Sequence, residues 1–252
     1  MPQLTHTLIN DVFRGPVYGQ HDIFTAQSWA RFVKQHDLDI SRALFAHEDG
    51  RVIGTIAFAQ RDERAWLSVM GVLPPYRRLG YGRTLFGQAV DAVRTSGATH
   101  IEFEVVQRNE HARKMYESFG FRVVGELYVW SRKARRIPDG LSYARRSLAS
   151  VLRVAAPSPV CWQRDPIAVA RAGSSALVEV DGAYAYVLKR GDAGIVLDAG
   201  ARDEASAHAL LRAIDERVPY DLTLLNEPST SPLTPALAAA AWRIVERQYQ
   251  LK

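Results

Sequence analysis

The stretch that most constrains this chain is residues 72–82, which read Val-Leu-Pro-Pro-Tyr-Arg-Arg-Leu-Gly-Tyr-Gly. The apolar run before it, residues 65–73, predicts a buried strand, and residues 83–94 after it have helical periodicity. Gly80 and Gly82 therefore lie where a strand turns into a helix. A glycine lets a ligand approach the backbone N–H groups, and the free N–H groups at a helix start favour an anion.

The charge and spacing of this stretch point to pyrophosphate. Three cationic side chains accompany the glycines: Arg77, Arg78 and Arg83. A P-loop is excluded because the chain has no Gly-x-x-x-x-Gly-Lys-Ser/Thr run, and a Rossmann turn needs a third glycine where this chain has Leu85. Glu102 and Glu104 do follow at the distance of a Rossmann ribose-binding acid, so that alternative is weakened and stays open.

A second motif follows in residues 101–121. Residues 101–106 alternate apolar and polar side chains, which predicts a strand, and residues 110–118 have the period of a helix. Asn109 is placed to cap that helix. Together the two stretches predict strand, glycine loop, helix, strand and capped helix.

With both motifs the chain resembles the GNAT superfamily of acetyl-CoA-dependent N-acetyltransferases over about residues 20–131. The family's cofactor signature, Arg/Gln-x-x-Gly-x-Gly/Ala, is matched by Arg77, Gly80 and Gly82. Its second motif, Asn-x-x-Ala-x-x-x-Tyr-x-x-x-Gly-Phe, is matched by Asn109, Ala112, Tyr116, Gly120 and Phe121. The resemblance implies an α/β (α+β) fold with a mixed, mostly antiparallel sheet flanked by helices.

The resemblance also implies the activity, an acetyl transfer from acetyl-CoA to a primary amine by direct attack in a ternary complex. Backbone groups around the fourth family strand would pair with the pantetheine arm and polarise the thioester carbonyl. The cofactor-binding residues implied in this way are Met70, Gly71, Val72, Arg77, Arg78, Leu79, Gly80, Tyr81, Gly82, Arg83, Asn109 and Ala112.

Two residues are the catalytic candidates. Tyr116 is the expected acid, because a phenol stays protonated at neutral pH and can protonate a leaving thiolate. Glu104 is the expected base, although an exposed carboxylate needs burial or a water relay for that role, and Glu102 on the same strand face is an alternative. An acetyl-cysteine route is not expected, since Cys161 is the single cysteine.

The acceptor is open from sequence alone. By resemblance, residues 11–29 and about 128–133 shape its pocket, and Asp11 and Asp22 are acids that suit a cationic amine. A small-molecule amine, a peptide N-terminus and a lysine side chain all fit. The alternative function is a non-catalytic acyl-CoA-binding module whose C-terminal part regulates or binds a partner.

The chain is expected to hold two domains. Residues 1–135 form the acetyltransferase domain, 136–160 a basic helical linker, and 161–252 a smaller degenerate GNAT-like domain. Residues 242–249 echo residues 121–128, but the Arg-x-x-Gly-x-Gly pattern is missing from the second copy. Asp198, Asp203 and Glu204 are expected near its cofactor position, where they would repel pyrophosphate. The first family strand is missing from the first copy, and we expect the second copy to cover that sheet edge.

Composition sets the remaining expectations. One cysteine excludes a disulfide framework, and no apolar stretch or leader pattern indicates a membrane, so the cytoplasm is the expected compartment. The scattered histidines predict no metal site. The net charge is +5, but the basic cluster at residues 132–146 lacks interleaved aromatics and is read as a solvated linker, not a nucleic-acid surface. A homodimer stays open.

Overall fold

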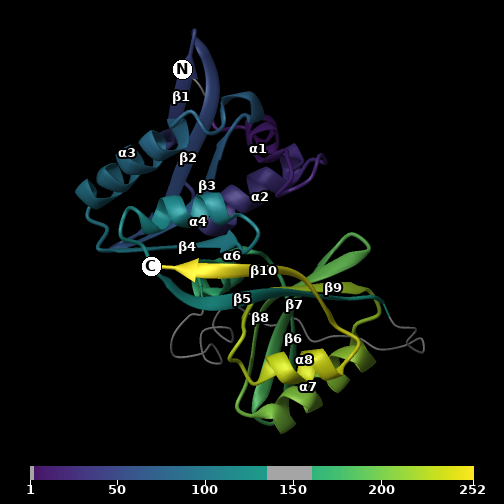
Figure 1. Ribbon diagram of the computed structural model, residues 1–252. Helices are drawn as coiled ribbons and strands as arrows, with labels where there is room; N and C mark the ends of the chain where they lie inside the picture. Colours follow the sequence, from purple (N-terminus) through teal and green to yellow (C-terminus); the bar gives the residue numbers. More distant parts are fainter. Residues whose placement is uncertain (1–2, 135–160) are drawn as a thin grey trace. The chain divides into compact units, whose positions relative to one another are not determined.

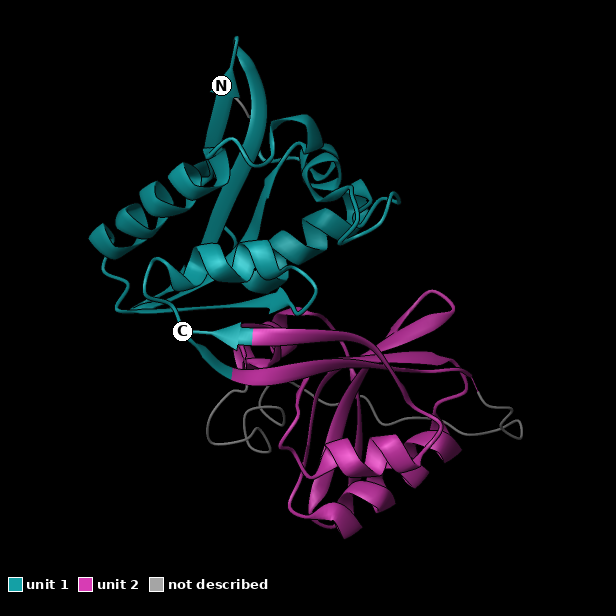
Figure 2. Cartoon of the chain, in the orientation of Figure 1, with its two compact units in different colours: residues 1–124, 250–252 teal, residues 125–249 magenta. Residues whose placement is uncertain are grey.

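A computed structural model describes residues 3–134 and 161–252 (Figure 1). The chain divides into two compact units, and the first takes residues from both ends of the sequence (Figure 2). Unit 1 contains residues 1–124 and 250–252, and unit 2 contains residues 125–249.

Unit 1 is a four-stranded sheet with helices on both faces. Its strands run in the order β1-β2-β3-β4, with β1·β2 and β2·β3 antiparallel and β3·β4 parallel. The elements are α1 (His6–Phe13), α2 (Ala26–His36), η1 (Ile40–Arg42), β1 (Leu44–Glu48), β2 (Arg51–Arg61), β3 (Arg64–Val72), η2 (Pro74–Tyr76), α3 (Tyr81–Thr95), β4 (His100–Val106) and α4 (Glu110–Glu117).

Local signals explain where these helices begin. Thr25 and Ser28 form a reciprocal capping box at α2, and the Asn109 side chain accepts a hydrogen bond from the Ala112 N–H at α4. The expected Asn109 cap is therefore confirmed. α3 buries an apolar stripe that includes Phe86, and on the same sheet face the Phe86 ring lies 6.0 Å from that of Phe103 on β4.

The carboxyl ends of β3 and β4 diverge. Their ladder stops at Trp66↔Glu102, although β3 continues to Val72 and β4 to Val106. The β2·β3 register places Phe58 opposite Leu67 and Ala57 opposite Val69, so Ser68 is an extra, bulged residue. Bulge and divergence open the sheet beside the glycine loop.

Unit 2 carries six strands in the order β10-β5-β9-β8-β7-β6. Its core lies between this sheet and two helices and includes Leu210, Ile214 and Leu237, each at most 2% exposed. The elements are β5 (Val123–Arg132), η3 (Trp162–Arg164), α6 (Pro166–Arg171), β6 (Ala176–Val180), β7 (Ala183–Arg190), β8 (Ala193–Ala201), α7 (Glu204–Arg217), β9 (Asp221–Pro228), α8 (Leu233–Ala239) and β10 (Arg243–Leu251).

Unit 2 repeats the open sheet of unit 1. The parallel β8·β9 ladder stops at Val196↔Leu224, whereas the strands continue to Ala201 and Pro228. The β7·β8 register leaves Leu197 as an extra residue, and Leu197 is the fifth residue of its strand, as Ser68 is in β3. The two halves of the sequence thus build the same irregularity.

Unit 1 is completed by residues from the end of the sequence, and unit 2 begins within β5. In unit 1, Lys252 and Arg122 exchange both backbone hydrogen bonds, at 3.0 and 3.1 Å. In unit 2, β5 pairs with β9 through residues 127–132. Unit 1 is therefore not contained in the first half of the sequence.

Most predicted elements are found within a few residues of the expected positions, and the mixed, largely antiparallel sheet flanked by helices is confirmed. The predicted linker, 136–160, and its helix, 141–154, lie outside the described residues.

Two expectations are wrong. Among described strands β1 pairs only with β2, so no strand of the second copy pairs with the sheet edge that it was expected to cover. Arg132 is not solvated either: it is 2% exposed and lies 3.3 Å from Asp215. No described helix has the length and apolarity that a membrane crossing requires.

Candidate active site

The loop between β3 and α3 has the geometry of an anion site. Gly80 is the N-cap of α3 with φ +91°, a left-handed conformation that favours glycine. No side chain among the described residues caps the first turn of α3, and a Cβ on Gly80 would meet no atom within 4 Å. The helix start is thus open toward solvent, with its N–H groups directed at the space that an anion would fill.

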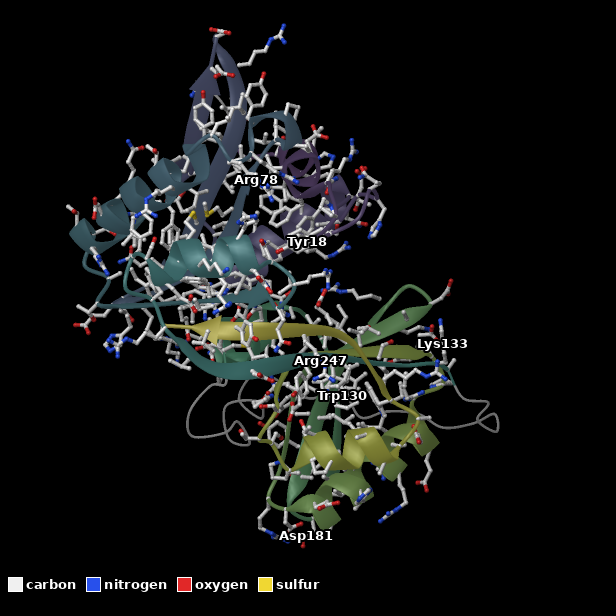
Figure 3. The ribbon with its side chains drawn as sticks, in the orientation of Figure 1. Tyr18, Arg78, Trp130, Lys133, Asp181 and Arg247 are labelled. Atoms are coloured by element: carbon white, nitrogen blue, oxygen red, sulfur yellow. The ribbon has the colours of Figure 1, made fainter. Side chains whose placement is uncertain are left out.

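Two of the three predicted arginines have partners on α4 or directly after it. Arg78, with φ +65°, is exposed, and its Nη2 lies 2.7 Å from Nε2 of His111 (Arg78 is labelled in Figure 3). Arg83 donates to Ser118 Oγ at 2.8 Å and lies over the Phe119 ring. These contacts join the start of α3 to α4, Arg78 at the first turn of α4 and Arg83 directly after its last turn.

The Arg77 side chain points to backbone carbonyls of β3 and the end of α1. Its Nε donates to the Val72 carbonyl at 2.9 Å, and its Nη2 donates to the carbonyls of Val12 and Arg14 at 3.1 and 2.5 Å. Burial lowers the pKa of its guanidinium. Because the side chain bonds three backbone carbonyls, it anchors the end of α1 to β3. The cofactor contact of Arg77 stays a prediction.

The strand residues beside the loop point to opposite faces of β3. Gly71 faces α1 so closely that a Cβ there would lie 2.7 Å from Val12. Met70 and Val72 face α3, since both would contact a Cβ placed on Gly82, at 3.6 and 3.8 Å. Next to Gly80, Leu79 is 64% exposed. The Tyr81 hydroxyl donates to Glu48, which with burial raises the pKa of Tyr81.

Tyr116 is buried at the open end of the sheet. Its ring lies 4.8 Å from Phe86 and 4.7 Å from Phe103, and its hydroxyl donates to Met70 Sδ at 3.6 Å. Burial, and next the charge of the Tyr18 phenol, raise the pKa of Tyr116. The phenol therefore holds its proton at neutral pH and lies beside the strand expected to bind the thioester.

The two candidate bases lie on the other face of β4. Glu104 Oε2 accepts a hydrogen bond of 2.9 Å from the Trp66 indole N–H. Glu102 is 7% exposed and lies 2.6 Å from Arg64 and 3.7 Å from Lys252 Nζ. Two cations thus hold the Glu102 charge, whereas a neutral donor orients Glu104.

Three residues beside the site were missed from sequence. Trp66 orients Glu104 by a hydrogen bond, and Tyr18 contributes to the raised pKa of Tyr116. Arg108 donates to the Val17 carbonyl at 2.9 Å. The parallel pairing of residues 65–73 with 101–106 is the signal that could have found Trp66. Tyr18 and Arg108 depend on long-range packing and carry no local pattern.

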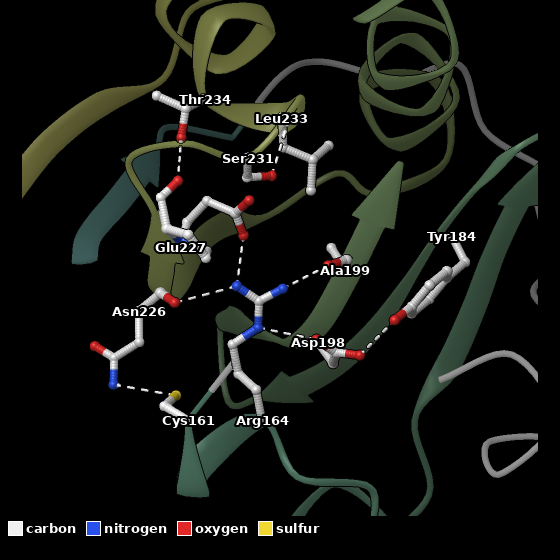
Figure 4. A network of polar contacts seen from close by, with 11 residues as sticks. Cys161, Arg164, Tyr184, Asp198, Ala199, Asn226, Glu227, Ser231, Leu233 and Thr234 are labelled. Carbon is white, nitrogen blue, oxygen red and sulfur yellow. Dashed lines mark hydrogen bonds and ion pairs between the residues drawn. The ribbon is translucent and has the colours of Figure 1, made fainter. Parts of the chain in front are cut away.

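In unit 2 an arginine fills the corresponding opening (Figure 4). The Arg164 guanidinium donates to the Ala199 and Asn226 carbonyls, one on each diverging strand, at 2.5 and 3.2 Å. It also contacts Asp198 at 2.9 Å and Glu227 at 2.5 Å. Burial opposes its charge, but the two carboxylates outweigh burial and raise the pKa of Arg164. Of the three acids expected here, Asp198 pairs with Arg164, Asp203 caps α7, and Glu204 is exposed in the first turn of α7, 3.6 Å from His208.

Sequence comparison finds a family model that is similar to part of unit 1. Residues 7–121 match the acetyltransferase (GNAT) family model. A curated relative, an uncharacterized N-acetyltransferase of Mycobacterium tuberculosis, is 31% identical over 100 residues, which are 39% of this chain and 64% of the relative. The chain spans 45% to 64% of the length of the curated relatives that it matches.

Structural comparison extends over both units. A GCN5-related N-acetyltransferase from Sphaerobacter thermophilus has a TM-score of 0.63 at 15% identity, over 92% of this chain and 86% of that one. A tandem GNAT protein from the clavulanic acid biosynthesis pathway has a TM-score of 0.54 at 14% identity, over 83% and 81%. At these identities the likeness shows the fold.

Proposed function

Because residues 7–121 form a domain of the acetyltransferase (GNAT) family, we propose that the chain is an N-acetyltransferase that moves the acetyl group of acetyl-CoA to a primary amine. The observation that carries the proposal is the uncapped start of α3 at Gly80, beside the diverging strands β3 and β4, with Glu104 on β4 and Tyr116 on α4 against Met70 of β3. Phosphate fits the N–H groups of α3, with Arg78 at the loop, and the opening between β3 and β4 fits the thioester end.

The chain's own groups supply each proton transfer. Glu104 accepts a proton from the amine, whose nitrogen then forms a bond to the acetyl carbon. A backbone N–H of β3 around Met70, Gly71 and Val72 donates to the carbonyl oxygen as it gains charge. As the carbon–sulfur bond breaks, Tyr116 gives its proton to the thiolate, and solvent later restores both groups.

The surroundings favour Glu104 over Glu102 as the base. A base must be able to take up a proton, and Glu102 is held between the cations of Arg64 and Lys252. The Trp66 indole N–H holds one oxygen of Glu104 in place, which orients this carboxylate. The chain also suits direct attack, since its one cysteine, Cys161, is buried in unit 2.

We propose that unit 2 is a GNAT-like domain without a cofactor site, so that the chain is a tandem protein. Its repeated bulge and strand divergence support the kinship, and the Arg164 guanidinium between β8 and β9 leaves the opening filled. In sequence, the two copies that we propose are residues 1–135 and 161–252, although residues from 125 on pack with the second unit and residues 250–252 with the first.

Turnover separates an enzyme from an acyl-CoA-binding module. The purified chain is incubated with acetyl-CoA and, in turn, a peptide with a free N-terminal amine, an N-terminally blocked lysine peptide and a small polyamine, while released thiol is followed. We expect release above the rate without amine for one class, and a loss of that release in Tyr116→Phe. Acetyl-CoA binding without release for any amine would favour the binding module.

A further inference from the structure

The backbone of residues 14–19, between α1 and α2, accepts hydrogen bonds from two arginines, one beside each of the two cofactor motifs. Gly15 and Gly19 close this loop with two backbone hydrogen bonds of 2.9 and 2.8 Å. At its start, Arg77 donates to the Arg14 carbonyl. At its tip, Arg108 donates to the Val17 carbonyl through Nε and Nη2, at 2.9 and 2.5 Å. Arg77 directly precedes the glycine loop, and Arg108 directly precedes Asn109.

The contact between Arg77 and the start of the loop is tightly packed. A Cβ on Gly15 would lie 2.5 Å from Arg77 Nη1, so the guanidinium and the loop backbone are in direct contact. Arg77 also bonds the Val72 carbonyl, which ties β3, the end of α1 and the loop to one side chain. A charged donor makes these hydrogen bonds stronger than neutral ones.

Residues 14–19 belong to the segment between α1 and α2, which lies against the end of β3. Its Tyr18 ring lies 4.8 Å from Phe13, and Tyr18 contributes, after burial, to the raised pKa of Tyr116. At the far end of the α1–α2 segment, buried Asn10 holds the backbone of Ile23 and Phe24 by hydrogen bonds of 3.0 and 2.9 Å. The segment thus forms a wall against the catalytic end of β3.

We propose that Arg77 and Arg108 are positioning residues that transmit occupancy of the cofactor loop to residues 14–19, the wall of the acceptor site. The inference rests on the proposed function. A ligand held by residues 78–83 and by the Asn109 turn immobilises the backbone next to each arginine, and each arginine holds one point of the wall. By linkage, a bound acceptor strengthens acetyl-CoA binding by the same factor.

Hydrogen exchange of the full chain, read by mass spectrometry with and without saturating acetyl-CoA, tests this. We expect acetyl-CoA to slow exchange in residues 14–19 of the wild type by about tenfold, the factor for one charge-assisted hydrogen bond. Arg77→Lys and Arg108→Lys keep the positive charge but lose the planar guanidinium that bonds several acceptors at once. In these variants acetyl-CoA should slow exchange of residues 14–19 by less than about threefold. Arg94→Lys, at the exposed end of α3, is the matched control and should behave as wild type.

The outcomes separate the two proposals. If acetyl-CoA does not bind the wild type, the proposed function fails. If it binds but leaves exchange of residues 14–19 unchanged, or slows it equally in both variants, the positioning role is wrong. Should Arg77→Lys not fold, Arg108→Lys decides alone, since Arg108 is exposed. Exchange in α7 serves as the internal standard.

Discussion

Replacing Arg164 with Met should destabilise the chain strongly. Arg164 is 3% exposed, and the side chains of its partners Asp198 and Glu227 are 9% and 1% exposed. The variant leaves two buried carboxylates without a cation, and breaking a buried pair in this way costs about 3–5 kcal/mol. That is a large part of the roughly 5–15 kcal/mol by which a folded protein is stable.

The assay is denaturant unfolding of the full chain at pH 7 and pH 5. We expect the loss to be smaller at pH 5, because protonation removes the uncompensated charge of the carboxylates. The variant Arg164→Met, Asp198→Asn, Glu227→Gln should recover much of the stability and lose this pH dependence. Arg202→Met is the matched control, since Arg202 also contacts two acids, Asp181 and Asp203, but at the surface, where ion pairs contribute little. An Arg164→Met effect as small as that control, or one independent of pH, would refute the reasoning.

Three further predictions concern unit 1. Tyr116→Phe should lower kcat about a hundredfold or more while acetyl-CoA affinity, measured by calorimetry, is kept; full turnover would leave Tyr116 a packing residue. Glu104→Gln should remove the acidic limb of the pH–rate profile, and an unchanged profile would exclude Glu104 as base. Burial, and next Arg61, lower the pKa of His36 to about 3, so folding should lose about 3 kcal/mol between pH 6.5 and pH 4, where the unfolded chain binds the proton; thermal unfolding of His36→Gln should lack this loss.

Local sequence patterns were sufficient to predict much of the fold and the conformation of the glycine loop. Helix starts are set by short-range chemistry such as the Thr25 capping box, and Gly80 adopts the left-handed conformation that its place before a helix requires. The strands of both units follow from apolar runs and alternation. The placement of Tyr116 next to Met70 follows from the motif, because a strand and the helix after the next strand meet at one sheet opening.

Long-range packing decided what local patterns missed. Arg77 binds three carbonyls because the end of α1 reaches β3 at Gly71, and nothing near Arg77 in sequence records that approach. Arg164 lies in a short segment without periodicity, and its partners come from strands more than thirty residues away. Lys252 reaches Glu102 only because the last residues of the chain belong to unit 1.

The most direct test of the account is a calorimetric titration of the intact chain with acetyl-CoA. We expect one site per polypeptide, and a loss of affinity of about a hundredfold or more in Gly80→Asp, which places a carboxylate in the anion site. Gly97→Asp is the matched control: Gly97 has φ +98° at the other end of α3, and a Cβ there also meets nothing within 4 Å. Two equivalent sites, or equal affinity in Gly80→Asp and wild type, would contradict the account.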